Sequence, residues 1–252
     1  MGRLVIISMD ILEKKYIVAV GDAGVDRNIK PAVLFDFFQS LTTEHGEDLG
    51  LGLDAMLKNG QGWVLSRFSL LIERRPRVVE TLTIRTWPQG FDSLSYMRNY
   101  DVLDEHGEIL ARASSAWIIL DIEQRRPLRP SALTIPIPAN EGRVFLEGGA
   151  RSLEKRDGFV KTMERAAYYS DIDFNGHVNN VRYIQWVQDA LPKDFLKDTA
   201  KFRIDINYTG EVLLGDTVEI FSAQETPLMI AMEGRRLPDN RTAFRAEIKI
   251  DG

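Results

Sequence analysis

Residues 21–39 read GDAGVDRNIKPAVLFDFFQ, and residues 170–188, which read SDIDFNGHVNNVRYIQWVQ, align with them without a gap. In this alignment a polar loop falls over a polar loop, and Asn28 falls over His177. After the second loop, apolar residues recur at the spacing of a helix face, as Val181, Ile184 and Val187 show. The sequence therefore predicts an internal duplication built around two amphipathic helices.

Alternating apolar and polar residues, the pattern of half-buried strands, follow each predicted helix. In the first unit these segments are residues 78–87, 96–103 and 108–120, and in the second they are residues 202–208, 217–223, 228–235 and 243–250. Short β-like segments at residues 15–20 and 159–167 precede the loops. A helix followed by an antiparallel meander, repeated twice, predicts an α+β fold in which each long helix is wrapped by a curved antiparallel sheet.

Proline usage marks a joint between the two units. Four of the ten prolines lie within residues 127–138, where fixed φ angles and missing donors favour an extended connector. We therefore divide the chain into a first unit at residues 1–125, a linker at residues 126–157 and a second unit at residues 158–252. Two unrelated α+β domains are the alternative, which the gapless match weakens.

Composition excludes several classes of function. The chain has 252 residues and no cysteine, which rules out disulfides, thiolate metal sites and a cysteine nucleophile. Three histidines make a multi-histidine zinc site improbable, so we predict no metal. A net charge of −5 argues against a general nucleic-acid binder. The apolar segment at residues 4–7 is too short for a signal sequence, and no run approaches the ~18 apolar residues of a membrane span, so we expect a cytoplasmic protein without membrane attachment.

The densest polar cluster, DIDFNGHVNN at residues 171–180, comes directly before the second helix. Its Asp and Asn residues could be only turn formers and helix caps. Two features favour a functional site instead. The loop ends at a helix N-terminus, whose free N–H groups can stabilise an oxyanion. The aligned loop carries Asn28 in place of His177, so the duplicated fold does not itself require the imidazole.

Asn-Gly-His-Val-Asn-Asn at residues 175–180, followed by Tyr183 and Trp186, resembles the active-site motif of acyl-ACP thioesterases, a double-hotdog family. The resemblance extends over about residues 10–250. It also rests on WVLSR (63–67), RP (75–76), TWP (86–88), SAW (115–117) through Asp121, QRRP (124–127), NYTGE (207–211) and GD (215–216).

The resemblance implies a tandem double hotdog in which the second unit is catalytic and the first, with a degenerate site, binds the acyl chain. It assigns Asp173, Asn175, His177 and Glu211 to the catalytic site. Many plant members carry a cysteine after that glutamate, whereas this chain has Val212, so water is the expected nucleophile. We expect Glu211 to be the general base, although the division of this role between Glu211 and Asp173 stays open because close carboxylates titrate as a pair.

The substrate side follows from the same resemblance. The expected partner is an acyl carrier protein bearing a fatty acyl chain, and no cofactor is implied. Candidates for contact with the substrate are Leu34, Phe37, Phe38 and Asn179. The apolar side chains among them could equally be core residues. Candidates for docking the acidic carrier protein are Arg74, Arg75, Arg125 and Arg126, although runs of arginine are more often solvated surface.

Other functions remain to be weighed. An acyl-CoA thioesterase and a non-catalytic acyl-binding module both suit a hotdog fold. The hydratase branch of that fold uses Asp-x-Asn-x-x-His, but Val178 holds the sixth position here and His177 comes one residue early. The sequence determines neither the preferred acyl chain nor whether the chain forms a homodimer.

Overall fold

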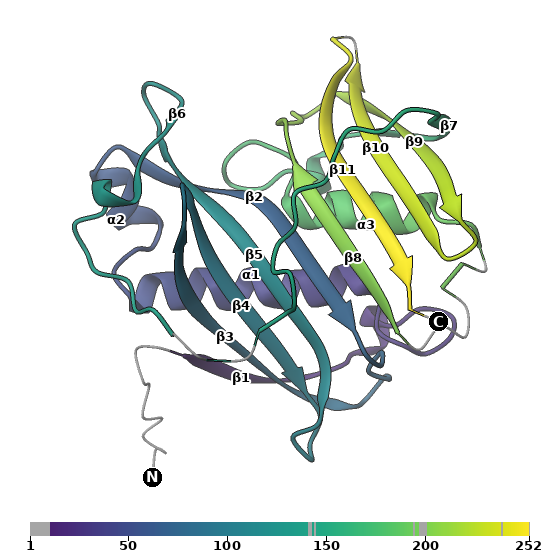
Figure 1. Cartoon of the computed structure of the whole chain (residues 1–252), viewed down its shortest axis with the longest axis horizontal. Helices are drawn as coiled ribbons and strands as arrows, with labels where there is room; N and C mark the ends of the chain where they lie inside the picture. Colours follow the sequence, from purple (N-terminus) through teal and green to yellow (C-terminus); the bar gives the residue numbers. More distant parts are fainter. Residues whose placement is uncertain are drawn as a thin grey trace.

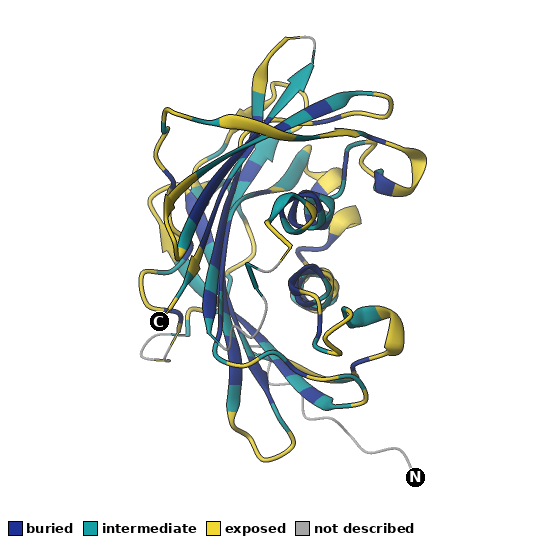
Figure 2. Ribbon diagram, turned by 90° about the vertical axis from the view of Figure 1, so that its right-hand side faces the viewer, coloured by how far each residue is buried: buried dark blue, intermediate teal, exposed yellow. Residues whose placement is uncertain are grey.

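The computed structural model describes residues 11–251 except 141–142, 144, 194, 197–200 and 238, so the apolar segment at residues 4–7 lies outside it. A curved antiparallel sheet forms one layer, and two helices lie side by side on its concave face (Figure 1, Figure 2). The main hydrophobic core lies between these helices and the sheet. The predicted α+β arrangement, with helices wrapped by a curved antiparallel sheet, is confirmed.

The helices are α1 (Pro31–Asp48), α2 (Leu53–Lys58) and α3 (Asn180–Ala190). The strands are β1 (Leu12–Ile17), β2 (Gln61–Ile72), β3 (Thr81–Asp92), β4 (Ser95–Leu103), β5 (Ile109–Asp121), β6 (Arg126–Pro127), β7 (Val160–Ala166), β8 (Phe202–Tyr208), β9 (Thr217–Thr226), β10 (Met229–Leu237) and β11 (Arg241–Ile250). Their order in the sheet is β1-β3-β4-β5-β2-β8-β11-β10-β9-β7, with β6 paired to β5. We call α1, α2 and β1–β6 the first half, and α3 and β7–β11 the second half. Pairing of β2 with β8 joins both halves into one sheet.

Each long helix forms because its apolar residues share one face. In α1 a proline occupies the first turn, where its missing N–H is not needed. Leu34, Phe38 and Leu41 are fully buried at helical spacing. In α3 the Asn179 side chain caps the helix by accepting the Val181 N–H at 2.9 Å. Both apolar faces are thereby turned toward the sheet.

The sequence did not predict β2, the strand of the first half that meets the second half. The burial of residues along β2 does not alternate, because Phe68, Ser69 and Leu70 are buried one after another. A strand covered on both faces lacks the period-2 signal. The short helix α2 was also missed, and β3 begins at Thr81 and not at residue 78.

The segment between the halves lies across the outer face of the sheet (Figure 1). The Arg151 N–H donates to the Ser69 hydroxyl of β2 at 3.2 Å. The Leu153 N–H donates to the Asn207 side chain of β8 at 2.7 Å. These contacts fasten the connector over the junction of β2 and β8. The division into units at residues 125 and 158 stays a prediction.

The same loop geometry precedes both long helices. The Lys30 N–H donates to the Asp22 carbonyl at 2.9 Å, and the equivalent Asn179 N–H donates to the Asp171 carbonyl at 2.8 Å. These residues fall over one another in the gapless sequence alignment. The two loops therefore share a scaffold, and they differ in the side chains that the scaffold carries.

Candidate active site

Glu211 lies in the loop between β8 and β9, and several contacts fix its backbone. The Arg236 guanidinium donates to the Glu211 carbonyl at 3.1 Å. Gly210 approaches β11 closely, since a Cβ there would lie 3.0 Å from the Thr242 carbonyl oxygen. Val212 is fully buried in the core, whereas the Glu211 side chain is 48% exposed. The loop therefore anchors on one residue and presents the next to solvent.

His177 is brought beside Glu211 by the backbone. A β-bridge joins His177 to Leu213, and the neighbouring Val178 N–H donates to the Val212 carbonyl at 2.8 Å. The His177 Nε2 lies 3.4 Å from the Glu211 Oε2, which is longer than a normal hydrogen bond. An imidazole and a carboxylate at this separation can hold a water and pass a proton between them.

Asp173 and Asn175 belong to the turn that leads to His177. The Asp173 carboxylate accepts the Asn175 N–H at 2.9 Å, and the Asp173 N–H donates to the His177 carbonyl at 2.9 Å. Gly176 completes the turn with φ of 79°, a region that favours glycine. Asn175 is exposed. Asp173 thus supports the turn that leads to His177, and its part in catalysis stays a prediction.

Tyr183 is a member of this cluster to which the sequence assigned no role. Its side chain is buried on α3, and burial raises its pKa. A hydrogen bond with the Val212 backbone lowers the pKa of Tyr183, whereas the charges of Glu211 and Asp173 raise it. Both carboxylates therefore act on the same phenol. The tyrosine was visible in the motif, but only the fold shows which groups surround it.

Arg125 is a second member that the sequence placed elsewhere. Its Nη2 donates to both oxygens of Glu211, at 2.7 Å each. The arginine lies in the turn between β5 and β6, so the first half contributes a charged group directly to a loop of the second. A separation of 86 residues leaves no local signal for this contact.

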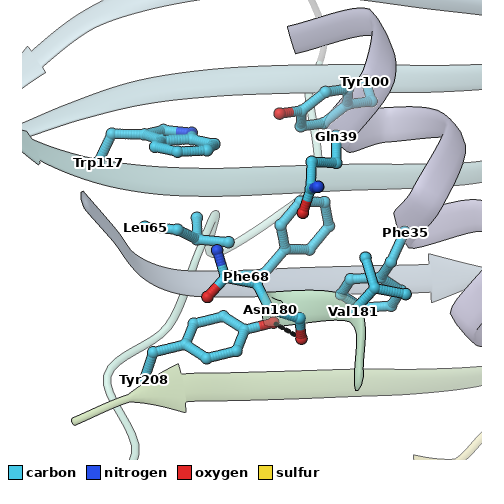
Figure 3. A pocket seen from close by; sticks show the side chains of 9 residues that line it. All are labelled: Phe35, Gln39, Leu65, Phe68, Tyr100, Trp117, Asn180, Val181 and Tyr208. Atoms are coloured by element: carbon cyan, nitrogen blue, oxygen red, sulfur yellow. Dashed lines mark hydrogen bonds between the residues drawn. The ribbon is translucent and has the colours of Figure 1, made fainter. Parts of the chain in front are cut away.

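A pocket lies between the two halves (Figure 3). Its lining residues are Phe35, Gln39, Leu65, Phe68, Tyr100 and Trp117 of the first half and Asn180, Val181 and Tyr208 of the second. The Tyr208 hydroxyl donates to the Asn180 carbonyl at 3.1 Å, which joins the strand before Glu211 to the start of α3. The cavity volume is only about 10 Å³, room for about one water molecule, and is far below the ~300–1,000 Å³ of small-molecule sites.

None of the residues expected to contact the acyl chain lines this pocket. Leu34 and Phe38 are fully buried in the core, and Phe37 stacks on Tyr16 with ring centroids 4.4 Å apart. Asn179 caps α3. The neighbouring face of α1, which carries Phe35, lines the pocket instead.

The four arginines expected to dock a carrier protein have different surroundings. Arg74 pairs with Glu80 at 2.6 Å, and Arg75 is nine-tenths buried and pairs with Asp26 at 2.7 Å. Arg126 is exposed on β6, next to Arg125. Arg74, Arg125 and Arg126 are therefore exposed, and the last two lie together at the β5–β6 turn.

The equivalent loop of the first half carries an ion pair where the second half has the candidate site. The bridge between Asn28 and Arg77 corresponds to that between His177 and Leu213, so Arg75 takes the place of Glu211. Asp26 falls over Asn175 and pairs with Arg75. Burial raises the pKa of Asp26, but hydrogen bonds with Asn28 and the Arg75 charge outweigh it and hold this pKa below its ordinary value. The first-half loop thus lacks an imidazole–carboxylate pair.

Comparison with known proteins gives this arrangement a context. Residues 10–131 match the family model of the acyl-ACP thioesterase N-terminal domain. Residues 155–250 match the model of the acyl-ACP thioesterase C-terminal domain. The chain belongs to the acyl-ACP thioesterase family. The motifs that span the sequence are therefore correctly interpreted as those of this family.

Curated relatives in the family are plant proteins. The chain is 27% identical over 237 residues to oleoyl-acyl carrier protein thioesterase 2 of Arabidopsis thaliana, which covers 85% of this chain and 63% of that protein. It is 28% identical to an acyl-carrier-protein hydrolase of Cuphea viscosissima, over 80% of this chain and 51% of that protein. The chain thus spans between half and two thirds of the length of these relatives.

Solved structures of family members share the fold. An acyl-ACP thioesterase from Bacteroides thetaiotaomicron superimposes with a TM-score of 0.79 at 21% identity, covering 96% of this chain and 98% of that one. The 12:0-ACP thioesterase from Umbellularia californica gives a TM-score of 0.77 at 19% identity, with 96% and 97% covered. The double-hotdog fold predicted from the motifs is therefore confirmed over nearly the whole chain.

Two features are absent from the described residues. None of the helices in this part of the chain is both long and apolar enough to cross a membrane. Among the same residues, no group of three or more acidic or histidine side chains is arranged to hold a metal ion.

Proposed function

We propose that this family member hydrolyses acyl thioesters of acyl carrier protein at the Glu211–His177 pair. The observation that carries the proposal is the 3.4 Å approach of the His177 Nε2 to an exposed carboxylate oxygen. Two residues that line the pocket between the halves are close to the pair along the chain. Asn180 comes three residues after His177, and Tyr208 comes three residues before Glu211. The family to which the chain belongs supports the choice of substrate.

In the proposed reaction Glu211 removes a proton from water, and the resulting hydroxide attacks the thioester carbon. The carbonyl becomes a tetrahedral oxyanion, and we assign its stabilisation to the exposed Asn175 amide. The intermediate then collapses and the carbon–sulfur bond breaks. The sulfur leaves with a proton relayed through His177, so water and thioester yield a carboxylic acid and a thiol.

We assign the base to Glu211 and not to Asp173. The Asp173 carboxylate accepts the Asn175 N–H within the turn, so it already has a structural task. The chain contains no cysteine and has Val212 after Glu211, so a thiol nucleophile is excluded and this scheme uses water. We place the acyl chain between the halves, where Phe35 and Trp117 provide apolar contact; the side chains that line this 10 Å³ cavity must move apart to admit it.

The test uses His177→Ala and Glu211→Gln with a medium-chain acyl-ACP. Each change is expected to lower kcat by about 10²–10⁴-fold, the range of general acid–base catalysis, while circular dichroism shows an unchanged fold. The matched control is the exposed pair His106 and Glu105, whose side chains approach to 3.7 Å on the β4–β5 turn. His106→Ala and Glu105→Gln are expected to leave kcat unchanged.

Two results would reject this proposal. Full activity in His177→Ala or Glu211→Gln would show that the chemistry lies elsewhere. An inactive wild type that still binds acyl-ACP would favour a non-catalytic acyl-binding module. The choice of carrier is tested by kcat/KM on matched acyl-ACP and acyl-CoA thioesters, and faster turnover of the CoA ester would make the protein an acyl-CoA thioesterase.

A further inference from the structure

Arg125 lies at a turn position whose backbone conformation suits other residue types better. The turn between β5 and β6 is closed by the Asp121 carboxylate, which accepts the Gln124 N–H at 2.8 Å. Arg125 follows with φ of 50°, in the left-handed region that suits glycine or asparagine. A strained residue that persists in a fixed turn is often held there for function. Its guanidinium is the part that makes a distinctive contact.

That contact occupies both oxygens of the candidate base. The Arg125 Nη2 lies 2.7 Å from the Oε1 and 2.7 Å from the Oε2 of Glu211. The His177 Nε2 is further away, at 3.4 Å from the Oε2. Charge-assisted hydrogen bonds at 2.7 Å are strong, whereas a separation of 3.4 Å is outside normal hydrogen-bond distance. The guanidinium therefore holds one lone pair on each oxygen of the carboxylate, which is closer to Arg125 than to the imidazole.

Opening of this ion pair would let the carboxylate turn more freely toward its water. A base must direct a lone pair at its water in the transition state. The Arg125 side chain is 65% exposed and lies at a turn, so a stronger anion can reach it from solvent. The neighbouring Arg126 is also exposed and adds positive charge at the same place.

We propose that Arg125 restrains Glu211 until an anionic group on the carrier side of the thioester takes the guanidinium and frees the carboxylate. This inference rests on the proposed function, because it makes Arg125 a positioning residue for the same base. Two sources supply such an anion: the phosphodiester of a phosphopantetheine arm and the carboxylates of an acidic carrier protein. The uncharged end of a simple thioester supplies neither.

The experiment compares the wild type with Arg125→Asn on four thioesters of one acyl group. They are the N-acetylcysteamine ester, which is uncharged, the pantetheine ester, the CoA ester, which has phosphates, and the acyl-ACP. Asparagine tolerates the left-handed conformation, so this variant should fold. Arg125→Lys keeps the charge, and Arg165→Gln on β7 removes an equal charge from an exposed strand.

On the two uncharged esters we expect Arg125→Asn to raise kcat by about twofold to fivefold, the effect of losing one exposed ion pair. On acyl-ACP the same variant should keep kcat and raise KM, because the anion loses its partner. Arg125→Lys should follow the wild type, and Arg165→Gln should change nothing. If the CoA ester behaves like acyl-ACP, the phosphate is the displacing anion; if it behaves like the uncharged esters, carboxylates of the carrier protein are.

Salt provides a second measurement on the same proteins. Exposed ion pairs weaken as ionic strength rises. The wild-type kcat on the N-acetylcysteamine ester should therefore rise with salt toward that of Arg125→Asn, whose own kcat should stay level.

The following results would contradict the proposed restraint of Glu211 by Arg125. A lower or unchanged kcat of Arg125→Asn on the uncharged esters would overturn the restraint. Loss of activity on all four esters would make Arg125 a group required by the chemistry. If Glu211→Gln remains fully active, or if the wild type hydrolyses none of the four esters, the proposed function fails first and the restraint fails with it.

Discussion

The surroundings of a single carboxylate decide what it can do in this protein. Glu233 on β10 has a side chain that is only 3% exposed, and its oxygens accept hydrogen bonds from Arg235 at 2.8 Å and Arg245 at 2.9 Å. Glu211 is half exposed, so water can reach it. Both glutamates accept hydrogen bonds from arginine, but Glu233 is buried with its partners, whereas the exposed Arg125–Glu211 pair is open to solvent.

Replacement of Glu233 tests this distinction through pH. Burial raises the pKa of Glu233, but hydrogen bonds from Arg235 and Arg245 outweigh it and hold that pKa below its ordinary value of 4.5. A lowered folded-state pKa stabilises the fold above the unfolded-state pKa, and this stabilisation is lost as pH falls through the folded-state value. Glu233→Gln should lower the free energy of unfolding by about 1–3 kcal/mol at pH 7, with a deficit that shrinks below pH of about 4.5.

Urea unfolding of wild type and variant between pH 7 and 3 measures this deficit. Glu164→Gln, a change on the exposed face of β7, is the control and should show little difference at any pH. A deficit for Glu233→Gln that stays constant across the range would mean that the buried charge has no part in the stability.

At the scale of elements, the start of α3 combines two tasks in adjacent residues. The loop from Asp173 to His177 carries candidate chemistry, whereas Asn179 caps the helix. We expect Asn179→Ala to lower stability by about 1 kcal/mol, because the Val181 N–H loses its acceptor. Thermal unfolding measures the loss, and KM for acyl-ACP should not change. Asn179→Asp retains an acceptor and should restore the stability; a raised KM in both variants would instead make this residue a substrate contact.

The elements that the sequence predicted are those whose apolar residues recur with a regular period. The helices α1 and α3 follow from their apolar stripes, and most strands of both meanders follow from alternation. The central strand β2 was missed because consecutive apolar residues, such as Leu70, Leu71 and Ile72, interrupt the alternation. The alternation of apolar and polar residues shows which residues of a strand face solvent, so a segment without it gives no strand signal in the sequence.

At the scale of the whole molecule, the two halves share one sheet and one core. The strands β2 and β8 pair along six residues each, and α1 packs against α3. We therefore expect a single cooperative unfolding transition, because neither half can unfold without exposing the other's apolar surface. Calorimetry should show one peak, with a van't Hoff enthalpy equal to the calorimetric one.

Fluorescence can follow the halves separately. Trp186 lies in α3, whereas Trp63, Trp87 and Trp117 lie in the first half. In Trp186→Phe the emission reports on the first half alone, and its midpoint should coincide with that from circular dichroism of the same variant. Two resolved transitions would show that the halves are independent domains.

The sequence by itself determined the duplicated architecture, the family and the identity of the residues that could do the chemistry. Apolar periodicity and a gapless repeat can be recognised from the order of the residues alone, without the fold. Only the tertiary structure decided which charges meet. It placed Arg125 on Glu211 across 86 residues, put Arg75 and Asp26 where the second half has its candidate site, and turned Phe35 and not Leu34 toward the pocket. Electrostatic contacts act through space, so they depend on a fold that no single segment contains.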